Sequence, residues 1–171
     1  MIDELPSVNG SANEVRVKVA ECAVAQGEAV LCTVGLGSCV AITLFDAQAR
    51  VGALAHILLP SQTLAHDRRN PAKFPGSAVP YMIERMRQLG ARDNRMRAKI
   101  AGGASMFTSL VPTGTIQMGE RNVLATRQAL ERAGIPLVGE DVGGGHGRSV
   151  FFYLSDGRVE VRSLVKGNAV F

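Results

Sequence analysis

The sequence predicts an α/β protein, a single-domain layered α/β sandwich with largely antiparallel, mixed sheets. Three observations lead to this fold class. Short apolar runs typical of strands fill most of the chain, only two segments space their apolar residues as helices do, and hairpins outnumber helical crossovers. A chain of 171 residues suits one core, because about 150 residues bury roughly 70% of their unfolded surface. We therefore expect one domain over residues 1–171, with residues 1–13 flexible.

The first strand signals follow residues 1–13. Residues 14–20 (EVRVKVA) alternate Val15, Val17 and Val19 with charged neighbours. This alternation is the period of a strand with one face in water. A second short apolar run, AVLCTVG, covers residues 29–35 and ends in glycine. Both runs are predicted to be strands.

The next two apolar runs predict a buried hairpin. Residues 38–45 (SCVAITLF) and 50–59 (RVGALAHILL) are apolar at almost every position. Continuous apolar runs of this length are typical of interior strands that are covered on both faces. The intervening residues 46–49 (DAQA) supply the turn.

Two segments have the spacing of amphipathic helices, residues 76–91 and 120–134. Ser77 is the expected N-cap of the first helix, and Gly90 and Gly134 are expected to end the two helices. The apolar faces of these helices are predicted to pack into the core. Their members are Val79, Met82, Ile83, Met86 and Leu89 in the first helix, and Val123, Thr126, Leu130 and Ala133 in the second.

The remaining strand signals lie in the second half of the chain. Residues 98–103 (AKIAGG) indicate a strand that enters a glycine turn, and residues 135–141 (IPLVGED) indicate another. Residues 149–164 contain two strand patterns around a two-residue Asp-Gly turn, which is a strong hairpin signal.

Composition argues against several classes of function. The net charge of +4 is modest, and the arginines are not interleaved with aromatic residues, which make up only 5% of the chain, so nucleic acid is not expected as a partner. The clustered arginines of the first helix form either a solvated face or a docking surface for an acidic protein.

The lengths of the apolar runs, the first residues and the cysteine pattern predict a cytoplasmic protein. No apolar run approaches the ~18 residues that cross a bilayer, so direct membrane insertion is not expected. The acidic first residues lack the pattern of a secretory signal. Three cysteines without a CxxC pair argue against a disulfide framework and against a zinc site. We expect a reduced protein without a metal.

Cys39 and His56 are the candidate reactive groups. Cys39 follows a glycine-rich turn at the start of one predicted interior strand, and His56 lies in the other. If the turn is symmetric about the bond between Ala47 and Gln48, Cys39 faces His56, and facing side chains have Cβ atoms about 4.5 to 5.5 Å apart. A slip of one residue would separate them onto opposite faces.

This pairing has a chemical use. A histidine beside a thiol lowers the pKa of the thiol by stabilising the thiolate as an ion pair. The glycines at positions 35 and 37 permit a sharp turn whose free N–H groups are available to an oxyanion. Thr33 and Ser38 are both candidates for the group that orients the imidazole. The alternative is that Cys39 and His56 are core residues, as we expect for Cys22 and Cys32.

A series of motifs, in the same order along nearly the whole chain, resembles the chemoreceptor glutamine deamidases of the CheD family. Together these motifs are far more specific than any one of them alone. They are LCTVGLGSCVAITLFD, GALAHILLP, AKIAGGASMF, MGERNV and GEDVGGGHGRSVFF.

The resemblance implies a sandwich similar to cytotoxic necrotizing factor-type deamidases, with a Cys-His-Thr triad and no cofactor. On this sequence the nucleophile is Cys39, the base is His56 and the third member is Thr33. Several other residues match family motifs without an assigned chemistry. They are Gly102, Gly103, Arg121, Asn122 and the turn from Gly143 to Arg148.

The implied function is deamidation of glutamine side chains in methyl-accepting chemotaxis receptors, a step in chemotaxis adaptation. The products are glutamate and ammonia, formed through a cysteine thioester. The phosphatase CheC is an implied partner. Two alternatives stay open, a non-catalytic adaptor that binds receptors or CheC, and a thiol-dependent receptor methylesterase.

Overall fold

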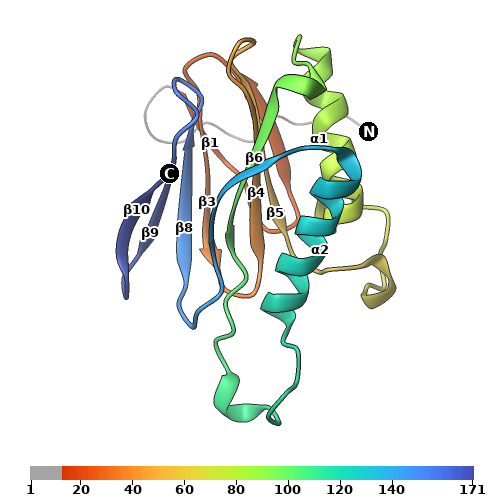
Figure 1. The fold of residues 1–171 in the computed structure, drawn as a ribbon, viewed down its shortest axis with the longest axis vertical. Helices are drawn as coiled ribbons and strands as arrows, with labels where there is room; N and C mark the ends of the chain where they lie inside the picture. The colour runs from red at the N-terminus through yellow and green to blue at the C-terminus, as the bar shows by residue number, and fades with distance from the viewer. Residues whose placement is uncertain (1–12) are drawn as a thin grey trace.

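The computed structural model describes residues 13–171, which form two facing five-stranded sheets with two helices over the outer face of one of them (Figure 1). The predicted flexibility of residues 1–13 lies outside the described residues, except for Asn13. Antiparallel pairs predominate, and each sheet also contains one parallel pair. The predicted fold class, a layered α/β sandwich with mixed sheets, is confirmed.

The first sheet holds the start of the described chain and its end. Its parallel pair joins β1 to β3, and all its other neighbours are antiparallel. The strands in spatial order are β1 (Glu14–Arg16), β3 (Val30–Leu36), β8 (Arg148–Tyr153), β9 (Val159–Ser163) and β10 (Gly167–Val170).

The second sheet lies between the first sheet and the helices. Its parallel pair joins β6 to β7 at one edge. The strands in spatial order are β2 (Cys22–Gln26), β5 (Val51–Ile57), β4 (Val40–Asp46), β6 (Met96–Gly102) and β7 (Leu137–Val142). All seven residues of β5 and six of the seven in β4 are buried. The predicted interior hairpin is confirmed, because both of its faces are covered.

The helices α1 (Pro75–Gln88) and α2 (Met118–Ala133) bury their apolar faces against the second sheet. Gly134 ends α2 in the left-handed conformation, as expected, with φ of 68°. The N-cap prediction for α1 is wrong. The helix begins two residues before Ser77, at Pro75, because proline at the first position already has a helical φ. The Ser77 hydroxyl instead donates to the Pro71 carbonyl, at 2.7 Å.

Short 3-10 helices complete the chain. They are η1 (Gln62–Leu64), η2 (Pro71–Lys73), η3 (Asp93–Arg95) and η4 (Thr108–Leu110).

The start of the described chain differs from the sequence prediction. The strand predicted over residues 14–20 ends at Arg16, and Val19 is 49% exposed because the chain reverses at Ala20, which has φ of 59°. The strand β2 was not predicted, because its residues CAVAQ are small and lack a clear alternation. The strand forms because its backbone pairs with β5, and this long-range pairing leaves no signal in the local sequence pattern.

Candidate active site

The register of β4 and β5 differs by two residues from the predicted one. Ala41, not Cys39, faces His56. The turn is centred one residue later than expected, because Asp46 accepts hydrogen bonds from the N–H groups of Gln48 and Ala49. Side chains in a strand alternate with a period of two, so this even shift keeps position 39 on the same face as His56.

Thr33 contacts His56 across the two sheets. The distance between Thr33 Oγ1 and His56 Nδ1 is 2.7 Å, and both residues are fully buried. Thr33 Oγ1 also donates to the Val17 carbonyl, at 2.6 Å. A carbonyl only accepts, so the single hydroxyl proton goes to Val17, and Oγ1 accepts from Nδ1–H. The imidazole therefore carries its proton on Nδ1 and a lone pair on Nε2.

The Nε2 atom of His56 is buried and has no hydrogen-bond partner among residues 13–171. Burial lowers the pKa of His56 to about 4. The ring is therefore neutral at neutral pH. An unpartnered lone pair on a neutral ring is what a base needs before it accepts a proton.

Cys39 is a buried residue at the wall of a pocket of about 400 Å³. Burial raises the pKa of its thiol, and its own backbone N–H partly offsets this effect. Burial favours the neutral form of both groups, whereas the ion pair predicted from the sequence requires both to be charged. The described residues include no hydrogen bond between Cys39 Sγ and His56 Nε2.

The backbone carbonyl groups of residues 37–39 all accept hydrogen bonds. The donors to these carbonyls come from the glycine turn after β6 and from α2. Ala104 N–H donates to Gly37, Asn122 Nδ2 to Ser38 and Gly103 N–H to Cys39, each at 2.8 Å. Within the described chain, the N–H groups of Ser38 and Cys39 make no hydrogen bond to another residue. These N–H groups are available to a bound oxyanion.

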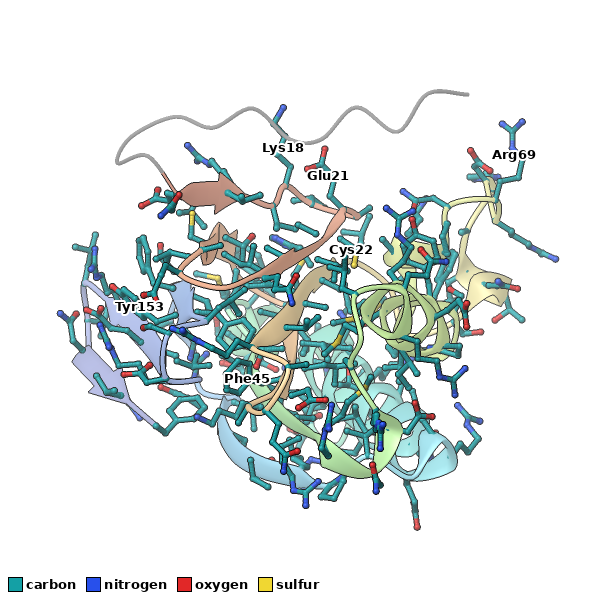
Figure 2. The ribbon with its side chains drawn as sticks, turned by 90° about the horizontal axis from the view of Figure 1, so that it is seen from above. Lys18, Glu21, Cys22, Phe45, Arg69 and Tyr153 are labelled. Carbon is teal, nitrogen blue, oxygen red and sulfur yellow. The ribbon has the colours of Figure 1, made fainter. Side chains whose placement is uncertain are left out.

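Of the two candidates for the orienting group, Thr33 is the one whose side chain contacts His56. Thr33 holds the Nδ1 atom of His56, and Nε2 has no partner within residues 13–171, so Ser38 makes no hydrogen bond to this ring. The other cysteines lie elsewhere. Cys22 lies on β2 beside α1 (Figure 2), and Cys32 is buried, with its sulfur 3.5 Å from a Glu14 carboxylate oxygen.

The glycines of two motifs without an assigned chemistry permit a close approach of backbones. A Cβ atom on Gly102 would lie 2.3 Å from the Cys39 carbonyl oxygen, and Gly102 has φ of 109°. A Cβ atom on Gly119 would lie 2.4 Å from the Ala104 carbonyl oxygen. Only glycine fits at these positions, because Gly102 packs against the backbone of Cys39 and Gly119 packs α2 against the backbone of Gly103 and Ala104. Asn122, one helical turn beyond Gly119, has a contact to Ser38 that sequence reasoning missed.

The turn from Gly143 to Arg148 supports the same loops. Gly143 N–H donates to the Gly102 carbonyl at 2.9 Å, and Ser105 N–H donates to the Gly144 carbonyl at 2.8 Å. The Arg148 side chain is buried and forms an ion pair with Asp141 at 2.9 Å. This turn therefore holds the glycine turn and Ser105 beside the pocket.

Within residues 13–171, no three His, Cys, Asp or Glu side chains are grouped so as to hold a metal ion. None of the helices in this part of the chain is long and apolar enough to cross a membrane.

Known proteins share much of this sequence. A family model described as CheD chemotactic sensory transduction matches residues 58–163. A probable chemoreceptor glutamine deamidase CheD of Caldanaerobacter subterraneus subsp. tengcongensis is 42% identical over 153 residues, which cover 90% of this chain and 94% of the relative. The protein of the same name in Pyrococcus abyssi is 40% identical over 157 residues, which cover 92% and 96%.

Among solved structures, the Bacillus licheniformis hypothetical protein YfiH matches with a TM-score of 0.44 at 14% identity. The match covers 70% of this chain and 49% of that one.

Proposed function

This chain belongs to the CheD family, and from that premise we propose that it deamidates glutamine side chains of chemoreceptors, with Cys39 as nucleophile, His56 as base and Thr33 as the orienting group. One observation carries the proposal. Thr33 holds the Nδ1–H of a neutral, buried His56 and so leaves the Nε2 lone pair free. That arrangement is the one a cysteine hydrolase requires of its histidine.

The first step joins sulfur to the substrate. The Cys39 thiol transfers its proton to His56 Nε2 as the sulfur attacks the carboxamide carbon of the glutamine. The π electrons of the carbonyl move to oxygen. Because burial keeps both groups neutral at rest, proton transfer accompanies attack rather than preceding it. The imidazolium keeps its Nδ1–H bonded to Thr33.

The second step releases ammonia. The N–H groups of Ser38 and Cys39 stabilise the negative oxygen of the tetrahedral intermediate. His56 returns its proton to the leaving nitrogen, the carbon–nitrogen bond breaks, and a thioester remains on Cys39. Water then gives a proton to His56 and adds to the thioester. As the carbon–sulfur bond breaks, His56 returns this proton to the sulfur, which restores the thiol and the neutral imidazole, and the product acid ionises to glutamate.

The exposed apolar side chains beside the pocket favour a protein as the substrate. Met106 and Phe107 line the pocket, and exposed apolar side chains continue along the same loop to Leu110 and Ile116. Phe107 is 68% exposed and Leu110 is 78% exposed. Apolar side chains gathered at a pocket mouth are typical of a surface that binds another protein. We propose that this rim of the pocket binds a segment of a methyl-accepting chemotaxis receptor.

On the basic face of α1, Arg87 is already paired with acidic side chains of the same chain. Arg87 donates to Asp93 and to Glu84 within the same chain. We therefore place receptor docking at the pocket rim rather than at this helix. We also propose the phosphatase CheC as a partner. The proposed compartment is the cytoplasm, where a reducing environment keeps a catalytic thiol free.

The test is mass spectrometry of receptor peptides after incubation with the protein. Conversion of glutamine to glutamate adds about 1 Da and releases ammonia, as thioester chemistry requires. Cys39→Ala should remove both signals. Methanol release from methylated receptor would instead identify a methylesterase. Tight receptor binding without ammonia or methanol would identify an adaptor.

A further inference from the structure

Asn122 is a fully buried side chain of α2 that touches both segments of the candidate site. Its Nδ2 atom donates to the carbonyl of Ser38 at 2.8 Å and to the carbonyl of Leu58 at 3.3 Å. Ser38 precedes Cys39, and Leu58 follows β5, the strand that carries His56. The amide assignment follows from chemistry, because the opposite orientation would place Oδ1 against two carbonyl oxygens.

The amide of Asn122 lies where the ladder between β4 and β5 stops. The last facing pair is Val40 and Ile57. Beyond it the two chains no longer pair with each other, and Leu58 N–H donates to the Lys73 carbonyl instead. The two N–H groups of one amide thus bridge the carbonyls of the separated chains. This bridge fixes the position of the Ser38–Cys39 peptide at the open end of the ladder.

The direction of this peptide decides where the N–H of Cys39 points. A trans peptide is planar, and its C=O and N–H groups point in opposite directions. Because Asn122 holds the Ser38 carbonyl on the side of α2, the Cys39 N–H must point away from α2. This N–H lies beside the Cys39 sulfur, where it lowers the pKa of the thiol.

We infer that Asn122 is a positioning residue that aims the Cys39 N–H at the reacting sulfur and at the oxyanion formed beside it. The inference rests on the proposed function, in which this N–H is an oxyanion donor. Asn122 does not touch the substrate. It acts through the peptide that it holds.

Packing alone does not account for an asparagine here. The Oδ1 atom of Asn122 is buried without a hydrogen-bond partner among the described residues. Such an atom destabilises the folded state, and an apolar side chain of the same volume would avoid that cost. The polar side chain is therefore explained by its two donors and the peptide they orient.

Two substitutions and one matched control test the inference. Asn122→Leu keeps the volume and removes the donors, and Asn122→Ser leaves space for water should the leucine variant fold poorly. The control is Thr126→Val, because Thr126 is one turn further along α2 and equally buried, and its hydroxyl has no hydrogen-bond partner in the described part of the chain. All variants are first checked for a cooperative thermal transition.

The first measurement is the kinetics of ammonia release from a receptor substrate. We expect both Asn122 variants to lose about 10 to 100-fold in kcat with KM within about twofold, because an oxyanion donor acts on the transition state and not on substrate binding. Thr126→Val should retain the parent kcat.

The second measurement is the pH profile of Cys39 alkylation by iodoacetamide, read by peptide mass spectrometry. This reaction forms no oxyanion and does not require deamidase activity. We expect the midpoint of the profile to move to higher pH in the Asn122 variants, with the plateau rate unchanged, because the thiolate loses an aimed N–H donor.

The outcomes separate the inference from the proposed function. Failure of the parent protein to release ammonia would reject the proposed function, while the alkylation midpoint would still test the orientation of the N–H. An unchanged midpoint in both Asn122 variants overturns the inference. A loss of kcat that Thr126→Val shares equally also overturns it, since the effect would then be one of packing.

Discussion

Thr33 and His56 lie on strands of opposite sheets, and their side chains meet with Oγ1 2.7 Å from Nδ1. The hydroxyl proton of Thr33 is committed to the Val17 carbonyl, so the contact specifies one tautomer of the imidazole. The contact also joins the two layers of the sandwich at the candidate site. The orientation of the imidazole therefore depends on how the sheets pack together.

Replacement of Thr33 should slow catalysis without preventing it. In Thr33→Ala the ring loses the acceptor for its Nδ1–H, and we expect kcat to fall by about 10 to 1000-fold, or about 1.4 to 4 kcal/mol. Thr33→Ser should recover much of this loss because it restores the hydroxyl. Ammonia release measured at saturating receptor substrate checks both values.

Ser38→Ala is the control for this prediction. Its hydroxyl makes no hydrogen bond with the imidazole, so the variant should retain most of the parent activity. A crippled Ser38→Ala protein beside a fully active Thr33→Ala protein would assign the orienting role to Ser38.

The three cysteines should differ in their importance for activity. Burial raises the pKa of Cys22 to about 12, and burial together with Glu14 raises that of Cys32 to about 11. Neither residue lines the pocket that contains Cys39. We expect Cys22→Ala and Cys32→Ala to keep deamidase activity and Cys39→Ala to abolish it. Loss of turnover in a well-folded Cys32→Ala protein would require a different nucleophile.

The buried His56 should make the protein sensitive to acid. Burial lowers the pKa of His56 to about 4, whereas an unfolded histidine titrates near 6.5. The unfolded chain therefore binds the proton more readily. The stability that the neutral ring contributes is fully present above about pH 6.5 and is lost as the pH falls toward about 4.

Thermal midpoints measured across this pH range test the sign of that effect. The midpoint of the parent protein should fall more steeply between pH 6.5 and 4 than that of His56→Gln. His66→Gln, at an exposed loop position, should follow the parent. Parallel curves for the parent and His56→Gln would mean that His56 titrates normally in the fold.

Gly119 and Gly76 provide a matched pair, because each is the second residue of its helix. In Gly119→Ala the new methyl group would lie 2.4 Å from the Ala104 carbonyl oxygen, so α2 must move away from the turn beside Cys39. We expect a loss of about 1 to 3 kcal/mol in stability, as for other overpacked sites, and a lower kcat.

In Gly76→Ala the one described atom that the new methyl group meets within 4 Å is a flexible arginine nitrogen, at 4.0 Å. Alanine has the higher helix propensity, so this variant should be as stable as the parent or more stable by up to about 1 kcal/mol. Chemical denaturation gives both values. Equal stability changes in the two variants would show that the close approach at Gly119 can relax.

The amino-acid sequence by itself determined the fold class and the buried hairpin of β4 and β5. Apolar residues at nearly every position of these strands require cover on both faces, and that pattern is local. The alternation of side chains between the two faces of a strand is also a local property. Cys39 was therefore placed on the correct face even though the predicted register was wrong by two residues.

Only the tertiary structure decided the register and the contacts of the site. The register depends on Asp46, whose carboxylate binds the turn N–H groups and also accepts from Arg95, distant in sequence. Thr33 reaches His56 from the opposite sheet, and Asn122, which lies 84 residues after Ser38 in the sequence, reaches Ser38 from α2. Local patterns report the burial of a residue and the period of its element. They carry no information about which distant groups the packed layers bring within hydrogen-bond distance.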